Sequence, residues 1–295
     1  MRDWLLLFAL VAMWGSAFMF IKIAVATVPP ATIAAGRLLI GAMVLLAVVY
    51  ARGLRLPSLA SAWRQYAWLA VIGNAVPFYL IAWGQQVIDS ALTGILIAVM
   101  PLATLVLAHY FVHGEHITRH RAIGFILGFA GIVMLMGPAA LTGFAGSALQ
   151  IVSQLAVLAG ALCYAANTIV ARLTIKGDVL VVSAGVLLLA SVMMVPVALA
   201  LDRPWTLTPS SASIAAVVWL GIGATGIPTI CYFALIGSAG PTFMSLVNYI
   251  SPCLALLLGV VIMNEEPGPN AYAGLALILS GIALSQFRRL ASPVP

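Results

Sequence analysis

The chain has 295 residues, of which 64% are hydrophobic and only 7% are charged, with a formal net charge of +6. Soluble domains carry about 25% charged residues, so this composition excludes a soluble enzyme or a soluble binding domain. Apolar runs recur at about 20 residues, the length with which one helix crosses a hydrocarbon core about 30 Å thick. We therefore predict an all-α, multi-pass membrane protein.

Charges, prolines and glycines divide the apolar runs into ten predicted transmembrane helices. The first five cover residues 4 to 25, 31 to 51, 66 to 86, 90 to 112 and 119 to 137. The second five cover residues 149 to 171, 179 to 201, 212 to 236, 240 to 262 and 269 to 287. The first run is too long for the apolar core of a signal peptide and contains Lys22, so we interpret it as a membrane helix.

Basic residues set the predicted orientation, because cytoplasmic loops of membrane proteins collect Lys and Arg. If the N-terminus is cytoplasmic, only Lys22, Arg37 and Arg203 fall on the other side of the membrane. The remaining basic residues fall on the cytoplasmic side: Arg2, Arg52, Arg55, Arg64, Arg119, Arg121, Arg172, Lys176, Arg288 and Arg289. We predict that both termini lie in the cytoplasm.

The second half of the chain repeats the first at a shift of about 150 residues. The repeat matches Pro77 with Pro228, Pro101 with Pro252, Gly124 with Gly274, and Gly131 with Gly281. Each half holds five predicted helices, an odd number, so the second half must enter the membrane from the opposite side. We predict two inverted five-helix repeats, at residues 1–138 and 149–289, and a short tail at 290–295. In transporters built this way the substrate binds near the midplane, between the repeats.

Several stretches give the chain a resemblance to a known family. They are WGSAFMFIKIA at 14 to 24, Arg37 early in the second helix, PLATLVLAHYFVHGE at 101 to 115 and PCLALLLGVVIMNEE at 252 to 266. Over its whole length the chain resembles the EamA-type branch of the drug/metabolite transporter superfamily, and within it the bacterial exporters of aromatic amino acids. The resemblance implies an exporter of the bacterial inner membrane whose substrate is an aromatic amino acid.

Two stripes of side chains run along the predicted third helix. One carries Asn74, Pro77, Phe78, Ile81 and Gln85, and the other carries Tyr79, Trp83 and Gln86. In the eighth helix the first stripe stays largely polar or aromatic, with Thr225, Pro228, Thr229, Tyr232 and Ile236, whereas the second becomes Ile230, Ala234 and Gly237. If both halves line one cavity, the first stripe is the better candidate for its wall.

The same comparison over the other helices completes the set of candidate substrate-binding residues. These are Trp14, Phe18, Asn74, Phe78, Tyr79, Trp83, Met100, Tyr164, Asn167, Thr229, Tyr232, Asn248 and Tyr249. The three Asn side chains are the first choices for the polar end of a substrate, and the rings are candidate walls. An equally open interpretation is that each Asn only joins two helices by hydrogen bonds.

Prolines recur at equivalent places in the predicted third and eighth helices and in the fourth and ninth. A proline removes one backbone hydrogen bond and bends a helix, which a membrane tolerates where neighbouring groups satisfy the freed carbonyl. We predict that Pro77, Pro101, Pro228 and Pro252 kink these helices and act as hinges. The Gly124-x3-Gly128 pair is predicted to let another helix approach, within a monomer or in a weak homodimer.

Charged residues are sparse within the predicted helices, and no Asp or Glu falls in the middle of one. Proton-coupled exchangers generally need such a carboxylate, so we predict alternating access without proton coupling. Lys22 and Arg37 fall in the outward halves of the first two helices. We favour interfacial anchoring for both, with attraction of a substrate carboxylate as the alternative.

Other functional classes find less support in the sequence. All four histidines lie at 109, 113, 116 and 120, but Gly114 interrupts them, so we expect no metal site. An intramembrane enzyme needs clustered Asp, or Ser and His on facing helices, and no such set is present. A channel, or an exporter of another small amphipathic metabolite or drug, remains an alternative. We expect membrane lipid and a small molecule as partners, no nucleic acid and no cofactor.

Overall fold

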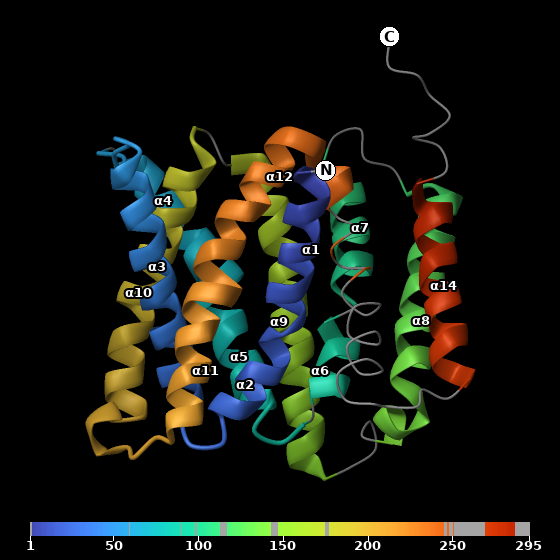
Figure 1. Ribbon diagram of the computed structural model, residues 1–295, viewed down its shortest axis with the longest axis horizontal. Helices are drawn as coiled ribbons and strands as arrows, with labels where there is room; N and C mark the ends of the chain where they lie inside the picture. The colour runs from blue at the N-terminus through green and yellow to red at the C-terminus, as the bar shows by residue number, and fades with distance from the viewer. Residues whose placement is uncertain are drawn as a thin grey trace.

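The computed structural model describes residues 2–58, 60–88, 90–97, 99–112, 117–142, 147–174, 177–244, 247, 250 and 269–286. Within these ranges the secondary structure is helical throughout, and the helices stand side by side along one direction (Figure 1). Seven helical stretches of the described chain are long and apolar enough to cross a membrane. The predicted all-α membrane protein is thereby confirmed.

The helices of the first half correspond to the first five predicted crossings. They are α1 (Arg2–Gly15), α2 (Ala17–Ala24), α3 (Pro30–Ala51), α4 (Ala60–Ala70), the π-helix η1 (Val71–Ala75), α5 (Val76–Gly84), α6 (Ser90–Ile97), α7 (Met100–Phe111) and α8 (Arg119–Thr142). Two short helices together make the first crossing, because α1 and α2 meet at Ser16 within one apolar stretch, Arg2–Ala24.

The described part of the second half contains elements equivalent to most of these. They are α9 (Ala148–Thr174), α10 (Val179–Leu201), the short 3-10 helix η2 (Pro204–Thr206), α11 (Ser211–Gly221), the π-helix η3 (Ile222–Gly226), α12 (Ile227–Met244) and α14 (Pro269–Gln286). Asp178 begins α10 as an N-cap, since its carboxylate accepts hydrogen bonds from the backbone N–H groups of Leu180 and Val181.

The predicted number of ten crossings is not confirmed. Helices α8 and α14 occupy the fifth and tenth predicted positions but are not among the seven candidate spans. Most of the predicted ninth crossing, 240 to 262, lies outside the described residues. Helix α12 also continues through the predicted turn at 237 to 239. The Ser238 hydroxyl lies 3.0 Å from the carbonyl oxygen of Ala234, four residues earlier, as a helical serine does.

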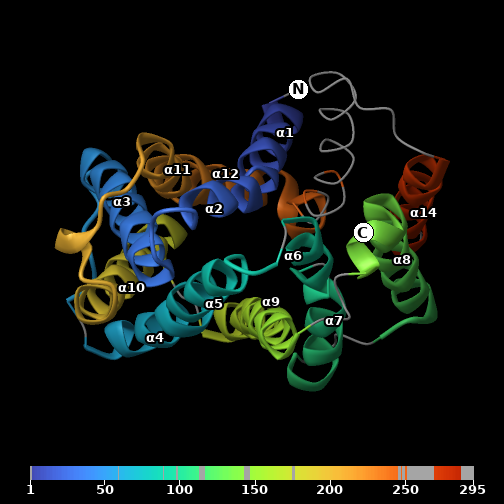
Figure 2. The same ribbon diagram turned by 90° about the horizontal axis from the view of Figure 1, so that it is seen from below.

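Equivalent helices of the two halves pack against each other in opposite directions. Helix α3 lies against α10, and α8 lies against α14 (Figure 2). The backbone N–H of Thr32, at the start of α3, donates to Asp202 Oδ2, at the end of α10, over 2.7 Å. Antiparallel pairing of equivalent helices is the arrangement that inverted repeats require.

The contact between α8 and α14 is reciprocal. A Cβ added to Gly131 would lie 2.7 Å from the carbonyl oxygen of Gly274, and one added to Gly281 would lie 2.5 Å from that of Gly124. The repeat matches Gly124 with Gly274 and Gly131 with Gly281, so each contact is the two-fold image of the other. The predicted close approach at Gly124 and Gly128 is confirmed, and the partner is a helix of the same chain.

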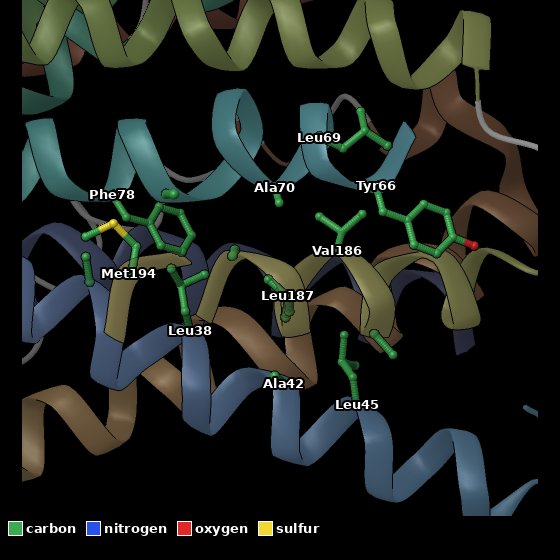
Figure 3. Packing of buried hydrophobic residues seen from close by; sticks show 14 of the residues in the cluster. Leu38, Ala42, Leu45, Tyr66, Leu69, Ala70, Phe78, Val186, Leu187 and Met194 are labelled. Atoms are coloured by element: carbon green, nitrogen blue, oxygen red, sulfur yellow. The ribbon is translucent and has the colours of Figure 1, made fainter. Parts of the chain in front are cut away.

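The largest apolar core lies where α3, α4, α5 and α10 meet. Figure 3 shows side chains from these helices pointing toward one another, with Leu38 and Leu45 on α3 facing Leu187 and Met194 on α10. Phe78 of α5 closes one side of this core, and its side chain is buried. The core therefore joins the two halves and positions α3 and α5 relative to each other.

We expect Gly281→Val to lower the free energy of unfolding by about 1–3 kcal/mol, since the added atoms would meet backbone that cannot rotate away. Thermal unfolding of the purified protein in detergent measures the change. Ala276→Val is the matched control, because Ala276 lies five residues earlier on α14 and is exposed. Equal stability of the two variants would contradict the tight α8–α14 contact.

Candidate functional site

Two π-helical turns occupy equivalent places in the two halves. Residues 222–226 of η3 follow residues 71–75 of η1 at a shift of 151. Each turn is followed by a buried proline, Pro77 or Pro228. Single π turns inside α-helices are rare and occur frequently at functional sites. A wide helical turn thus precedes Pro77 and Pro228, and the kinks and hinges predicted at these prolines stay predictions.

Polar side chains stabilise both π turns from inside the same helix. Asn74 Nδ2 donates to the carbonyl oxygen of Leu69 over 3.3 Å, and Thr225 Oγ1 donates to that of Leu220 over 2.8 Å. Asn74 and Thr225 are equivalent residues, and so are Leu69 and Leu220. In a membrane such bonds keep irregular backbone satisfied. Asn74 thus has a structural role, alongside its predicted role at the substrate.

Aromatic contacts join the two halves near these turns. The rings of Phe78 on α5 and Tyr164 on α9 lie 6.4 Å apart, centroid to centroid, at an interplanar angle of 66°. The rings of Trp14 on α1 and Tyr232 on α12 lie 5.9 Å apart at 47°. Both distances are typical of stabilising aromatic pairs. Four predicted residues are thus brought together as two pairs, each with one ring from each half.

Arg37 reaches inward to this region from α3. Its side chain is 6% exposed, and its guanidinium carbon lies 3.7 Å from the centroid of the Phe78 ring. Nε and Nη2 donate to Thr225 Oγ1 over 3.2 and 3.1 Å. Interfacial anchoring of Arg37 is therefore wrong. The face of α3 that carries Arg37 packs against α5 and the second half, so the side chain has no route to the lipid surface.

Lys22 binds the end of another helix. Its Nζ donates to the backbone carbonyl oxygens of Gln85 over 3.0 Å and Ile88 over 2.9 Å, just beyond the C-terminus of α5. A cation there complements the negative end of the helix dipole. The Gln85 amide is fully buried and donates back to the carbonyl oxygen of Phe18 over 3.2 Å. These bonds attach α2 to α5.

Hydrogen bonds fasten the two halves at the end of the bundle where α2 and α10 finish, the lower end in Figure 1. Thr27 Oγ1 lies 2.8 Å from Ser213 Oγ, and Ser213 Oγ donates to the carbonyl oxygen of Ile23 over 3.0 Å. The Asp202 carboxylate also accepts the Thr32 hydroxyl over 2.9 Å. The two halves are therefore held together at this end.

Asn167 lies on α9, close to the first π turn. Its Oδ1 atom is buried and has no hydrogen-bond partner within the part of the chain that the structure describes. A Cβ added at Gly73 of η1 would lie 2.5 Å from Asn167 Cγ. The glycine thus makes room for the amide. Asn167 is brought to the same region as Tyr164, which lies one turn earlier on α9.

The third-helix stripes differ in burial. Pro77, Phe78, Ile81 and Gln85 of the first stripe are buried, whereas Gln86 of the second is exposed. Tyr79 lines an open groove of about 220 Å³ with residues of α10 that include Met194 and Leu201. Trp83 is half-buried on the same stripe as Tyr79. The structure therefore does not place Tyr79 and Trp83 on the face that carries Phe78.

The remaining predicted residues occupy varied places. Phe18 packs on the cluster around Ile21, and the Thr229 hydroxyl donates to the Thr225 carbonyl oxygen over 2.6 Å. Met100 begins α7, so Pro101 lies in the first turn of that helix, where proline is well tolerated. Asn248, Tyr249 and Pro252 lie outside the described residues.

The predicted set of substrate-binding residues did not include Arg37 or Thr225, although the sequence put Thr225 on the candidate stripe and gave attraction of a carboxylate as the alternative for Arg37. Thr225 had a signal, because it is the repeat equivalent of Asn74. Arg37 had one too, because it is a cation two turns into an apolar helix, where an interior partner is as consistent with the sequence as the membrane surface.

Comparisons with known proteins agree with this architecture. Residues 3–137 and 152–287 each match the EamA-like transporter family. The uncharacterized inner membrane transporter YedA of Escherichia coli strain K12 is 28% identical over 292 residues, covering 94% of this chain and 88% of that protein. An uncharacterized transporter of Archaeoglobus fulgidus is 27% identical over 286 residues, covering 96% and 98%. One solved crystal structure shares the fold, with a TM-score of 0.76 over 99% of both chains at 24% identity.

We expect Thr225→Val to lower the free energy of unfolding by about 1–3 kcal/mol, because it keeps the side-chain shape while removing the partner of both Arg37 and the Leu220 carbonyl. Thermal unfolding in detergent measures the loss. Thr168→Val serves as control, since Thr168 is exposed on α9 and its hydroxyl bonds only within its own helix. If both variants unfold at the same temperature as wild type, the Thr225 hydroxyl does not stabilise this region.

Proposed function

Because the chain belongs to the EamA-like transporter family, we propose that it exports aromatic amino acids, and other neutral hydrophobic amino acids, by alternating access. The transport itself follows from the family and agrees with the names of the relatives. The substrate, the direction and the absence of proton coupling are our proposals, as is an inner-membrane orientation with both termini in the cytoplasm.

The observation that carries the substrate proposal is the pair of aromatic contacts between the halves. Phe78 with Tyr164, and Trp14 with Tyr232, place rings of both halves beside the π turns. Aromatic rings bind a flat apolar side chain by offset or edge-to-face contacts. Rings from both halves would let one substrate bridge the parts of the protein that must move in alternating access.

Transport without proton coupling is supported by where the described carboxylates lie. Asp3 lies in the first turn of α1, Asp178 caps the start of α10, and Asp202 follows its end. None of these three lies within the middle of a candidate span. A carboxylate that exchanges a proton for a substrate generally lies inside the membrane, so gradient-driven movement fits these residues better.

Reconstituted efflux tests the proposal directly. We expect liposomes containing the protein to release labelled phenylalanine and tryptophan with saturable kinetics, at the same rate with and without a pH gradient. Trp14→Leu and Tyr164→Leu should each raise KM by roughly 3- to 10-fold, since an aromatic contact contributes about 0.5–1.5 kcal/mol. Trp205→Leu is the control, because Trp205 is exposed in η2.

Three outcomes would contradict parts of the proposal separately. If neither phenylalanine nor tryptophan moves or competes, the substrate is wrong, and another amphipathic metabolite or drug takes its place. A flux that requires the pH gradient overturns uncoupled transport. A flux that does not saturate indicates a channel.

Alternating access requires the bundle to open at the end where hydrogen bonds hold the two halves together. With the N-terminus in the cytoplasm, the contacts of Thr27 with Ser213 and of Thr32 with Asp202 lie on the outer side. The described conformation is then closed toward the outside. Release of an exported substrate requires these contacts to separate.

A cross-link tests this separation. We expect Thr27→Cys with Ser213→Cys, in a chain whose Cys163, Cys231 and Cys253 are replaced by Ala, to form a disulfide on oxidation, because the two hydroxyls lie 2.8 Å apart. Efflux should fall to background on oxidation and return on reduction. The single Thr27→Cys variant controls for oxidation alone. Full efflux by the cross-linked protein would show that this end does not open during transport.

A further inference from the structure

We propose that Arg37 binds the carboxylate of the transported molecule, so that the substrate class is aromatic and hydrophobic carboxylates, amino acids among them. This inference rests on the proposed function for the identity of the site. It adds a chemical rule that the function alone does not contain. A molecule of the same shape without a carboxylate should bind weakly.

The charge of Arg37 is buried without an acidic partner in the described chain. The side chain is 6% exposed; it donates to the Thr225 hydroxyl and lies against the Phe78 ring, both of which are uncharged. The described Asp residues are engaged elsewhere: Asp202 with Thr32, Asp178 with the start of α10 and Asp3 with Ser238. A buried cation that lacks an anion is costly and has a strong preference for gaining one.

The geometry of the guanidinium leaves it suited to an incoming anion. Arginine has five N–H donors in one plane, and the bonds to Thr225 Oγ1 come from Nε and Nη2 on one edge. The ring of Phe78 covers a face of the plane rather than an edge. The edge formed by the two terminal nitrogens matches the two oxygens of a carboxylate, which guanidinium groups bind in parallel.

The position of Arg37 agrees with a substrate site. The 22 residues of α3 span about 33 Å, and Arg37 lies about 10 Å along the axis from its first residue. Its long side chain then extends to Thr225 in the π turn of the other half. A carboxylate held here would place an attached ring near Phe78 and Tyr164, which are already in contact with each other.

Thr225 links Arg37 to the backbone of the helix on which Thr225 itself lies. Its hydroxyl accepts from Arg37 and donates to the Leu220 carbonyl oxygen across η3. A carboxylate that takes over donors of Arg37 weakens the first bond and leaves the second. Substrate binding thereby changes a contact between α3 of the first half and η3 of the second, which is the kind of contact that alternating access must remake.

The alternative is that Arg37 only pins α3 to the second half. Replacing Arg37 would destabilise the protein whether Arg37 only joins the two halves or also binds a carboxylate, so a stability measurement cannot separate the two roles. Ligand selectivity can separate them, because an arginine that only joins the two halves would not make the protein prefer a carboxylate over an amide of the same shape.

Binding of three matched probes tests the inference. They are 3-phenylpropionate, 3-phenylpropanamide and phenethylamine, titrated against the purified protein by quenching of its tryptophan fluorescence. We expect wild type to bind the carboxylate at least about tenfold more tightly than the amide or the amine, as charged hydrogen bonds imply. Arg37→Gln should remove this preference. Arg37→Lys, which keeps the positive charge but loses the paired donors of the guanidinium, should retain part of the preference for the carboxylate.

Arg203→Gln is the matched control, because Arg203 is an exposed arginine in the α10–η2 turn at the fastened end. It should bind all three probes as wild type does. If Arg37→Gln does not fold, the wild-type preference and Arg37→Lys still decide. Equal binding of carboxylate and amide by wild type, no binding of any probe, or a full preference in Arg37→Gln would overturn the inference.

The two proposals fail differently. Absence of phenylalanine and tryptophan efflux from wild type overturns the proposed substrate, while the preference for carboxylate over amide is measured by binding alone. Efflux of phenylalanine together with equal binding of the carboxylate and amide probes would leave the exporter in place and remove Arg37 from its site.

Discussion

Backbone polar groups inside a membrane must find partners within the protein, because the hydrocarbon offers none. This constraint explains where the chain departs from regular helix. The π turns η1 and η3 lie between the two halves, and each has a side chain that satisfies a carbonyl at its own start, Asn74 for Leu69 and Thr225 for Leu220. Irregular backbone is thus concentrated where neighbouring helices surround it.

The same constraint applies to charge, and two cations near one end of the bundle meet it in different ways. Lys22 donates to carbonyl groups that α5 leaves unsatisfied at its C-terminus, so backbone hydrogen bonds stabilise its charge. Within the described ranges, Arg37 donates to a hydroxyl and lies against a ring, and it has no carboxylate partner there. The first arrangement is complete as it stands. The arrangement around Arg37 would be stabilised by an anion, which is why Arg37 is a better candidate than Lys22 for binding the substrate carboxylate.

Sequence patterns predicted the features that depend on spacing. The repeat located both prolines that follow the π turns and the glycines of α8 and α14, and the polar stripe of the third helix is the buried one. Features that depend on the direction of a long side chain were missed: Arg37 extends inward instead of toward the interface. The partner of Asn74 was missed as well, because its amide donates to Leu69, five residues earlier, across a π turn that the sequence did not predict. The role of the candidate residues in binding stays a prediction.

The reciprocal glycine contact of α8 and α14 also bears on how such a chain arises. Gly124 meets Gly281, the counterpart of Gly131, and Gly131 meets Gly274, the counterpart of Gly124, so the contact uses one surface twice. Two separate copies of a single five-helix protein, inserted in opposite orientations, would form the same contact without any new surface. Fusing the two genes would then fix the opposite orientations in one polypeptide and let the two copies diverge in sequence.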